Sequence, residues 1–267
     1  MNSKMIIYVT GILVFFTVII IACEKDKKSS APELPPLSTF SIQVGEFSET
    51  TKAAGSYNNF FTAALATGYW NTVLTAYLAV PVASYAEAFN HPAQRLDNNT
   101  YEWTYQVVVQ DTTYTANLLA FIESDGINME MHISKEGGFQ DFVWYTGTFN
   151  LQRTEGQWTI QDNPENDMTW LNIMWHNDYE AKTFDIQYTN VYPTGNYKDS
   201  FIKYGIRKDN AYDAFYTIYS SPDDKTYEIE FNTTTHEGRI YYESLWHCWD
   251  ANYQDAVCQS VGFTHGY

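Results

Sequence analysis

The stretch Ile127-Asn-Met-Glu-Met-His-Ile133 decides the fold class, because its apolar and polar side chains alternate strictly. Successive side chains of a β-strand point to opposite faces of a sheet, so a period of two predicts one buried and one hydrated face. The same alternation recurs in residues 101–109, 184–189 and 227–232. The sequence therefore predicts a sheet whose strands each bury one face.

Turn-forming residues separate these strands, as in Glu136-Gly-Gly138 and Pro193-Thr-Gly195. We count about ten or eleven strands at hairpin spacing over about residues 101–245, which predicts an antiparallel meander. A meander of so many twisted strands must curl or close. We expect a mainly β domain, an open or closed barrel capped by N-terminal helices, with a β-sandwich as the alternative.

The region of about residues 50–90 has a different period. Tyr57, Phe60 and Ala64 recur at helical spacing, and further apolar stripes follow. Pro81 either ends this helical region or restarts it at a first-turn position. We therefore expect helices before the meander, packed on a large apolar surface.

The first residues have the layout of a secretory signal, since Lys4 precedes an uncharged apolar run that ends at Ala22. The run is also nearly long enough to span a bilayer, so an uncleaved anchor is the competing interpretation. Its end, Ile20-Ile21-Ala22-Cys23, resembles the lipobox of bacterial lipoproteins. That resemblance implies cleavage after Ala22 and acylation of Cys23, which would attach the chain to a membrane through its lipid.

This reading divides the chain into a signal peptide (1–22), a lipidated Cys and flexible linker (23–40) and one α+β domain (41–267). The linker prediction rests on a polar, Pro-rich composition. Glu24, rather than Asp, follows the lipidated position, which favours sorting to the outer membrane of a cell envelope. The mature domain resembles uncharacterised β-rich lipoproteins of Gram-negative envelopes, and its layout is similar to the helix-capped open barrel of lipoprotein carriers and receptors.

Two further cysteines, Cys248 and Cys258, remain once Cys23 carries lipid. They lie ten residues apart across a polar turn, and an oxidising compartment would allow them to form a disulfide that closes loop 248–258. The alternative is two free buried thiols.

Composition limits the function. The net charge of −17 repels phosphate backbones, so we expect no nucleic-acid partner. No serine-hydrolase elbow, phosphate-binding loop, dinucleotide fingerprint or zinc-helix motif occurs, so we expect no cofactor and favour a binding protein over an enzyme. We expect no metal site, since His132 and His176 fall on polar strand faces and the acidic stretches 162–167 and 250–255 are typical of turns as well as of Ca²⁺ ligands.

Three hypotheses for function follow. The first is a non-catalytic envelope lipoprotein that binds an amphipathic ligand or a partner protein between helices and sheet. The second is a surface glycan-binding module that uses exposed aromatic rings, for which Trp246, Trp249 and Tyr253 are the candidates. The third and least favoured is a hydrolase.

Overall fold

The computed structural model describes residues 31–41, 57–208 and 210–258. The predicted signal peptide and Cys23 lie outside these ranges. Within them, a short 3-10 helix η1 (Leu37–Thr39) precedes two α-helices, α1 (Asn58–Tyr77) and α2 (Ala79–Ala88). Neither α-helix has the length and apolar character needed to cross a membrane. Pro81 lies in the first turn of α2, the restart position that the sequence allowed.

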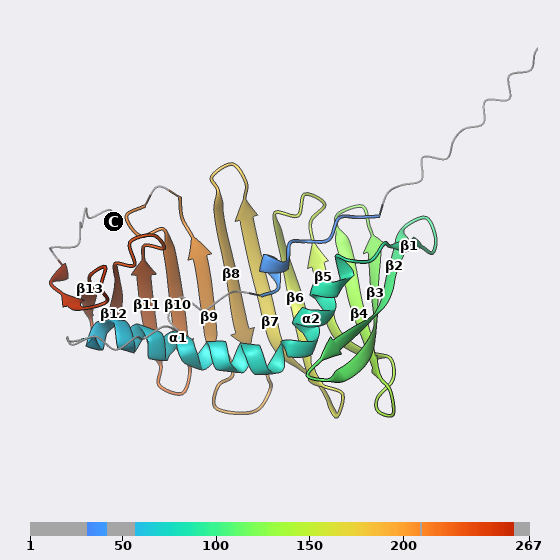
Figure 1. Ribbon diagram of the computed structural model, residues 1–267, viewed down its shortest axis with the longest axis horizontal. Coiled ribbons are helices and arrows are strands. Elements are labelled where there is room, and N and C mark those ends of the chain that lie inside the picture. The colour runs from blue at the N-terminus through green and yellow to red at the C-terminus, as the bar shows by residue number, and fades with distance from the viewer. Residues whose placement is uncertain (1–30, 42–56, 209, 259–267) are drawn as a thin grey trace, which may run out of the picture. The chain divides into compact units, whose positions relative to one another are not determined.

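All strands of the described residues belong to one antiparallel sheet, in which each strand pairs with the next in the chain (Figure 1). The strands are β1 (Gln94–Arg95), β2 (Thr100–Val109), β3 (Thr112–Ile122), β4 (Ile127–Lys135), β5 (Phe142–Phe149), β6 (Glu155–Asn163), β7 (Asn166–Asp178), β8 (Thr183–Asn190), β9 (Phe201–Ile206), β10 (Ala214–Ser220), β11 (Lys225–Phe231), β12 (Gly238–Tyr242), β13 (Leu245–Trp249) and β14 (Asp255–Ala256).

The predicted meander and its mainly β character are confirmed: the described residues form 14 strands, of which eleven, β2 to β12, lie within about the predicted range. Two of the additional strands, β1 and β14, have two residues each, too few to show an alternating pattern. These two strands are the edges of the sheet, which does not close on itself.

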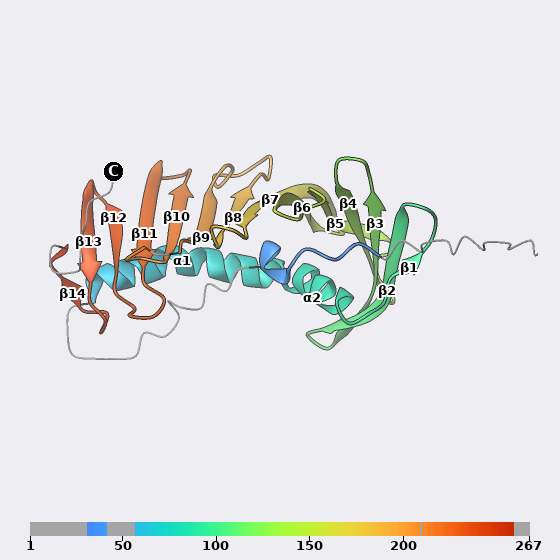
Figure 2. The same cartoon turned by 90° about the horizontal axis from the view of Figure 1, so that it is seen from above.

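Both α-helices lie on one face of the sheet (Figure 2). Helix α1 runs across the strands and contacts β10, β12, β13 and β14, whereas α2 packs against β2, which curls around it. The buried apolar side chains of the strands point to this face and form one core with the helices. We call this the helix face, and the opposite side of the sheet the outer face.

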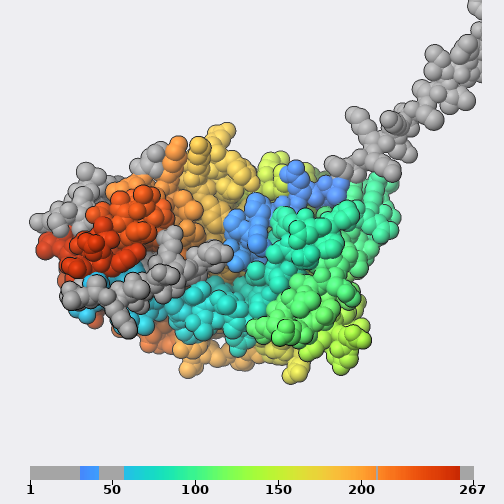
Figure 3. All heavy atoms as spheres, in the orientation of Figure 1, coloured from blue at the N-terminus to red at the C-terminus, as the bar shows by residue number. Residues whose placement is uncertain are grey.

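Residues 31–41 also pack on the helix face, beside α2 (Figure 3). The Phe40 side chain is 0% exposed and contacts the rings of Tyr85 and Trp158. The Tyr85 hydroxyl donates a 2.7 Å hydrogen bond to the carbonyl oxygen of Pro35. The predicted linker 23–40 was therefore too long, because the domain already includes residue 31. A Pro-rich composition indicated a tether and gave no sign of this packing.

Buried tyrosines join the helices to the sheet. The Tyr105 hydroxyl on β2 donates a 2.6 Å hydrogen bond to the carbonyl oxygen of Ser84 on α2. Burial raises the pKa of Tyr105, and it raises the pKa of Tyr85 and Tyr145 well above the usual value. These hydroxyls therefore remain protonated, and available as donors, across the ordinary pH range.

Large aromatic rings of the sheet lie over glycines. In four places a glycine stands directly opposite an aromatic residue on the neighbouring strand. The pairs are Gly147 with Trp158, Gly156 with Trp175, Gly205 with Phe215, and Gly238 with Trp249. A Cβ atom at Gly147 would lie 2.3 Å from ring atoms of Trp158, a distance at which the ring would have to move. Each glycine thus provides the space in which a ring packs against the strand.

We expect Gly147→Ala to lower the free energy of unfolding by about 2 to 3 kcal/mol, because Trp158 is fully buried and cannot move away freely. The control is Gly68→Ala in α1, where a Cβ atom meets nothing within 4 Å. That change should raise the free energy of unfolding by about 0.5 to 1 kcal/mol, because alanine is the better helix former. Denaturant unfolding measures both, and equal effects of the two variants would contradict the packing account.

Candidate functional site

The described residues of the helix face include two small pockets. One, of about 300 Å³, lies at the junction of α1 and α2 and includes Leu74, Leu78 and Val82. The other, of about 250 Å³, lies between the helices and β2, β3, β5 and β6. Buried side chains of the helices and strands pack together on the face where we expected an amphipathic ligand.

The outer face has the side chains that alternate with the core. Strand register places ten of them in one continuous line across β4 to β13, each directly opposite the next. This outer row consists of Asn128, Thr148, Gln157, Met174, Gln187, Lys203, Thr217, Glu228, Tyr241 and Trp246. Amide and hydroxyl groups predominate at the β4 end, and two aromatic rings stand at the β13 end.

A groove of about 540 Å³ crosses the outer face from β4 to β9. Asn128, Thr148, Gln157 and Gln187 of the outer row line it. Met174 stands among them with its side chain 60% exposed, so the groove has an apolar surface as well as polar groups. Such a combination, with a few placed polar groups, is typical of small-molecule sites.

Hydrogen bonds within the groove fix its polar groups. Thr148 Oγ1 donates to Asn128 Oδ1 at 3.0 Å, and Gln187 Nε2 donates to Thr189 Oγ1 at 3.1 Å. These bonds orient the two amides before any ligand arrives.

Three charged or titratable side chains, from β7, β8 and β9, meet at the β9 end of the groove. Lys203 Nζ lies 2.9 Å from Asp185 Oδ1, and His176 Nδ1 lies 3.8 Å from Asp185 Oδ2. Lys203 is thus paired with a carboxylate and does not present an isolated positive charge. No group of three or more His, Cys, Asp and Glu in the described part of the chain is placed to hold a metal ion.

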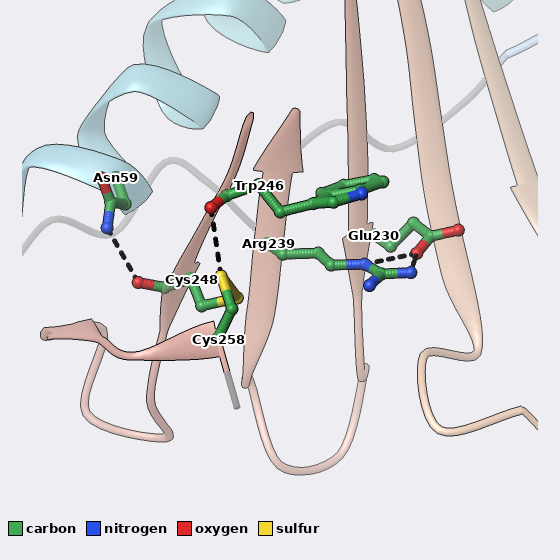
Figure 4. Close-up of a disulfide and its surroundings, with 6 residues drawn as sticks. All are labelled: Asn59, Glu230, Arg239, Trp246, Cys248 and Cys258. Carbon is green, nitrogen blue, oxygen red and sulfur yellow. Dashed lines mark hydrogen bonds and ion pairs between the residues drawn. A yellow bond between two sulfur atoms is a disulfide. The ribbon is translucent and has the colours of Figure 1, made fainter. Parts of the chain in front are cut away.

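Guanidinium groups lie over aromatic rings on the outer face towards β13, and Figure 4 shows Arg239 beside Trp246. The Arg239 guanidinium lies 4.0 Å from the ring centroid of Trp246, and Arg207 lies 4.1 Å from that of Phe215. Glu230 accepts hydrogen bonds from both arginines, at 2.7 Å from Arg239 Nε and 3.2 Å from Arg207 Nη1. The cation–π contact with Arg239 stabilises the position of the Trp246 ring.

The structure separates the three aromatic residues that the sequence suggested for glycan binding. Trp249 is 0% exposed, packs against Phe60 of α1 and donates a 2.8 Å hydrogen bond to the carbonyl oxygen of His236. Tyr253 also packs against Phe60, with ring centroids 4.4 Å apart. Trp249 is thus a core residue without an exposed face, contrary to the hypothesis, and Trp246 alone of the three lies on the outer face.

Sequence reasoning did not single out the groove residues. The alternating pattern placed Asp185 and Gln187 on a polar strand face, which the structure confirms. The register that sets Gln187 between Met174 and Lys203 depends on strand pairing, however, and no signal in the sequence specified it.

The predicted disulfide is confirmed, since Cys248 and Cys258 are bonded and their Cα atoms lie 5.1 Å apart (Figure 4). The loop that it closes carries β14, which contacts the start of α1. Asp255 Oδ1 accepts a 2.9 Å hydrogen bond from the backbone N–H of Asn59, and Asn59 Nδ2 donates to the carbonyl oxygen of Cys248 at 2.9 Å. Because the N-cap residue Tyr57 makes no side-chain capping bond, Asp255 serves as a cap from a distant part of the chain.

No protein-family model, curated protein or solved structure matches this chain. The functional argument therefore rests on the residues and their geometry.

We expect Cys258→Ser to lower the free energy of unfolding by roughly 2 to 3 kcal/mol, because the open loop no longer restricts the unfolded chain. Denaturant unfolding should give the same value for wild-type protein in reductant, and reductant should leave the variant unchanged. If reductant changed the stability of both proteins equally, the assigned role of the disulfide would be wrong.

Proposed function

We propose that this chain is a lipid-anchored protein of a bacterial envelope that binds a neutral saccharide in the outer groove without catalysing a reaction. The observation that carries the proposal is the groove itself, with its line of amides and hydroxyls interrupted by exposed Met174. The two pockets described on the helix face, of about 250 and 300 Å³, are smaller than this groove, which also supports the proposal.

The chemistry of the groove fits a sugar. Sugar hydroxyls both donate and accept hydrogen bonds, and the amides of Gln157 and Gln187 can do the same. The C–H surfaces of a sugar ring need an apolar contact, which Met174 offers. Glu123, Asp125, Glu155 and Asp185 also line the groove, so its charge disfavours an anionic ligand.

We propose binding without chemistry because the chain carries no catalytic motif. A glycosidase needs two carboxyl groups at a set separation on either side of the scissile bond. Asp185 forms an ion pair with Lys203. A carboxylate held in an ion pair is better suited to binding than to acting as a general acid.

The location follows from the sequence. We propose that Cys23 carries the lipid and that the anchor lies in the outer membrane, as the lipobox resemblance and Glu24 indicate. We further take the curved sheet as an open half-barrel, because it is one continuous sheet with both helices on one face.

Metabolic labelling with a fatty-acid analogue tests the anchor. We expect label on the wild-type protein and none on Cys23→Ser, because acylation requires the thiol. Cys258→Ser serves as the control for loss of a cysteine and should be labelled like the wild type. Label on Cys23→Ser, or none on the wild type, would remove the anchor from the proposal.

A glycan array followed by calorimetry tests the groove, with the unlipidated domain and neutral oligosaccharides as probes. We expect Gln157→Ala to weaken binding about tenfold, the value of one hydrogen bond of about 1.4 kcal/mol. The matched control is Gln106→Ala, an exposed glutamine on the outer face of β2 outside the groove, which should bind like the wild type. The proposal fails if no neutral saccharide is retained, or if both variants bind alike.

A further inference from the structure

We infer that the saccharide is an extended chain that lies along the outer row, from the groove to Trp246 on β13. The inference rests on the proposed function and adds a second contact region to it. It also identifies the class of ligand as a polymer rather than a single sugar.

The first argument is the geometry of the outer row. Six strand intervals separate Met174 on β7 from Trp246 on β13. At about 4.8 Å per interval, the two residues are roughly 29 Å apart along the sheet. Strand spacing is close to the length of one sugar unit in an extended chain, so each strand can present one side chain to one unit.

The second argument is the state of Trp246. Its ring lies on the Arg239 guanidinium and beside the ring of Tyr241, with a centroid distance of 5.3 Å. Arg239 is itself fixed by Glu230. The indole is only partly buried, so it presents a rigid aromatic surface at the end of the row. Rigid aromatic surfaces bind at a low cost in conformational entropy and are suited to stacking on sugar rings.

The third argument concerns the path between the two regions. Thr217 and Glu228 occupy the row between the groove and the neighbouring rings of Tyr241 and Trp246, and neither carries a bulky ring. In the neighbouring row, Phe215 lies over Gly205, where a Cβ atom would be 2.2 Å from the ring. The Phe215 ring is therefore pressed against the strand rather than raised above it, while Phe201 and Tyr219 lie in the row on the other side of the path.

Charge and apolar content favour a neutral polysaccharide over other polymers. A nucleic acid would meet Asp185, Glu228 and Glu230 on this face in a chain of net charge −17. A protein partner would need clustered apolar anchors. In the outer row, Met174 and Trp246 lie far apart.

Calorimetry on a length series of one neutral saccharide that the wild-type domain binds tests the inference. Oligomers that fit within the groove should bind the wild type and Trp246→Ala equally. Chains able to span roughly 29 Å should bind the wild type at least about tenfold more tightly than short ones, because a second contact adds to the first. Trp246→Ala should lose this gain.

Two further variants keep the result interpretable. Thr217→Arg places a large side chain in the path and should weaken long chains but not short ones, without removing Trp246. Tyr77→Ala removes an exposed aromatic ring from α1 on the helix face and should change neither. Affinity independent of chain length, or equal losses for short and long chains in Trp246→Ala, would overturn the inference. Short-chain binding that depends on Gln157 would still leave the proposed function standing.

Discussion

A tryptophan ring can pack flat against a β-sheet only where the neighbouring strand gives it space, and the rest of this structure depends on that constraint. Trp158, Trp175 and Trp249 are buried on the helix face, each opposite a glycine. The surface that results accepts Phe40, α2 and α1 in close contact. Both helices therefore pack on the helix face, and the apolar side chains of the strands are buried against them.

The same constraint determines what the outer face can be. The apolar side chains of each strand point into the core. The alternate side chains, which are amides, hydroxyls and charged groups, therefore lie on the outer face in register across the sheet. The same arrangement of a ring over a glycine occurs on the outer face, where Phe215 packs against the strand at Gly205. Arg207 lies over the Phe215 ring. We therefore propose that a ligand binds on the polar side of the sheet, whereas the sequence suggested the space between helices and sheet.

Local patterns predicted much of this fold. Alternation in residues such as Ile127 to Ile133 predicted strands and their buried faces, and cysteine parity predicted the Cys248–Cys258 bond. Properties that depend on distant partners were not accessible. Phe40 looked like part of a linker, and Trp249 looked equivalent to Trp246, because burial depends on which strand or helix a side chain meets. The line from Asn128 to Trp246 needs the register of ten strands, which no single segment contains.

The central claim is that the outer face, and not the helix face, receives the ligand. Hydrogen–deuterium exchange of the unlipidated domain, with and without the bound saccharide, tests it directly. The account predicts slower exchange in β6 to β9, and with a long chain also in β12 and β13, while α1 and α2 remain unchanged. Slower exchange confined to α1 and α2 would contradict it and return the ligand to the space between the helices and the sheet.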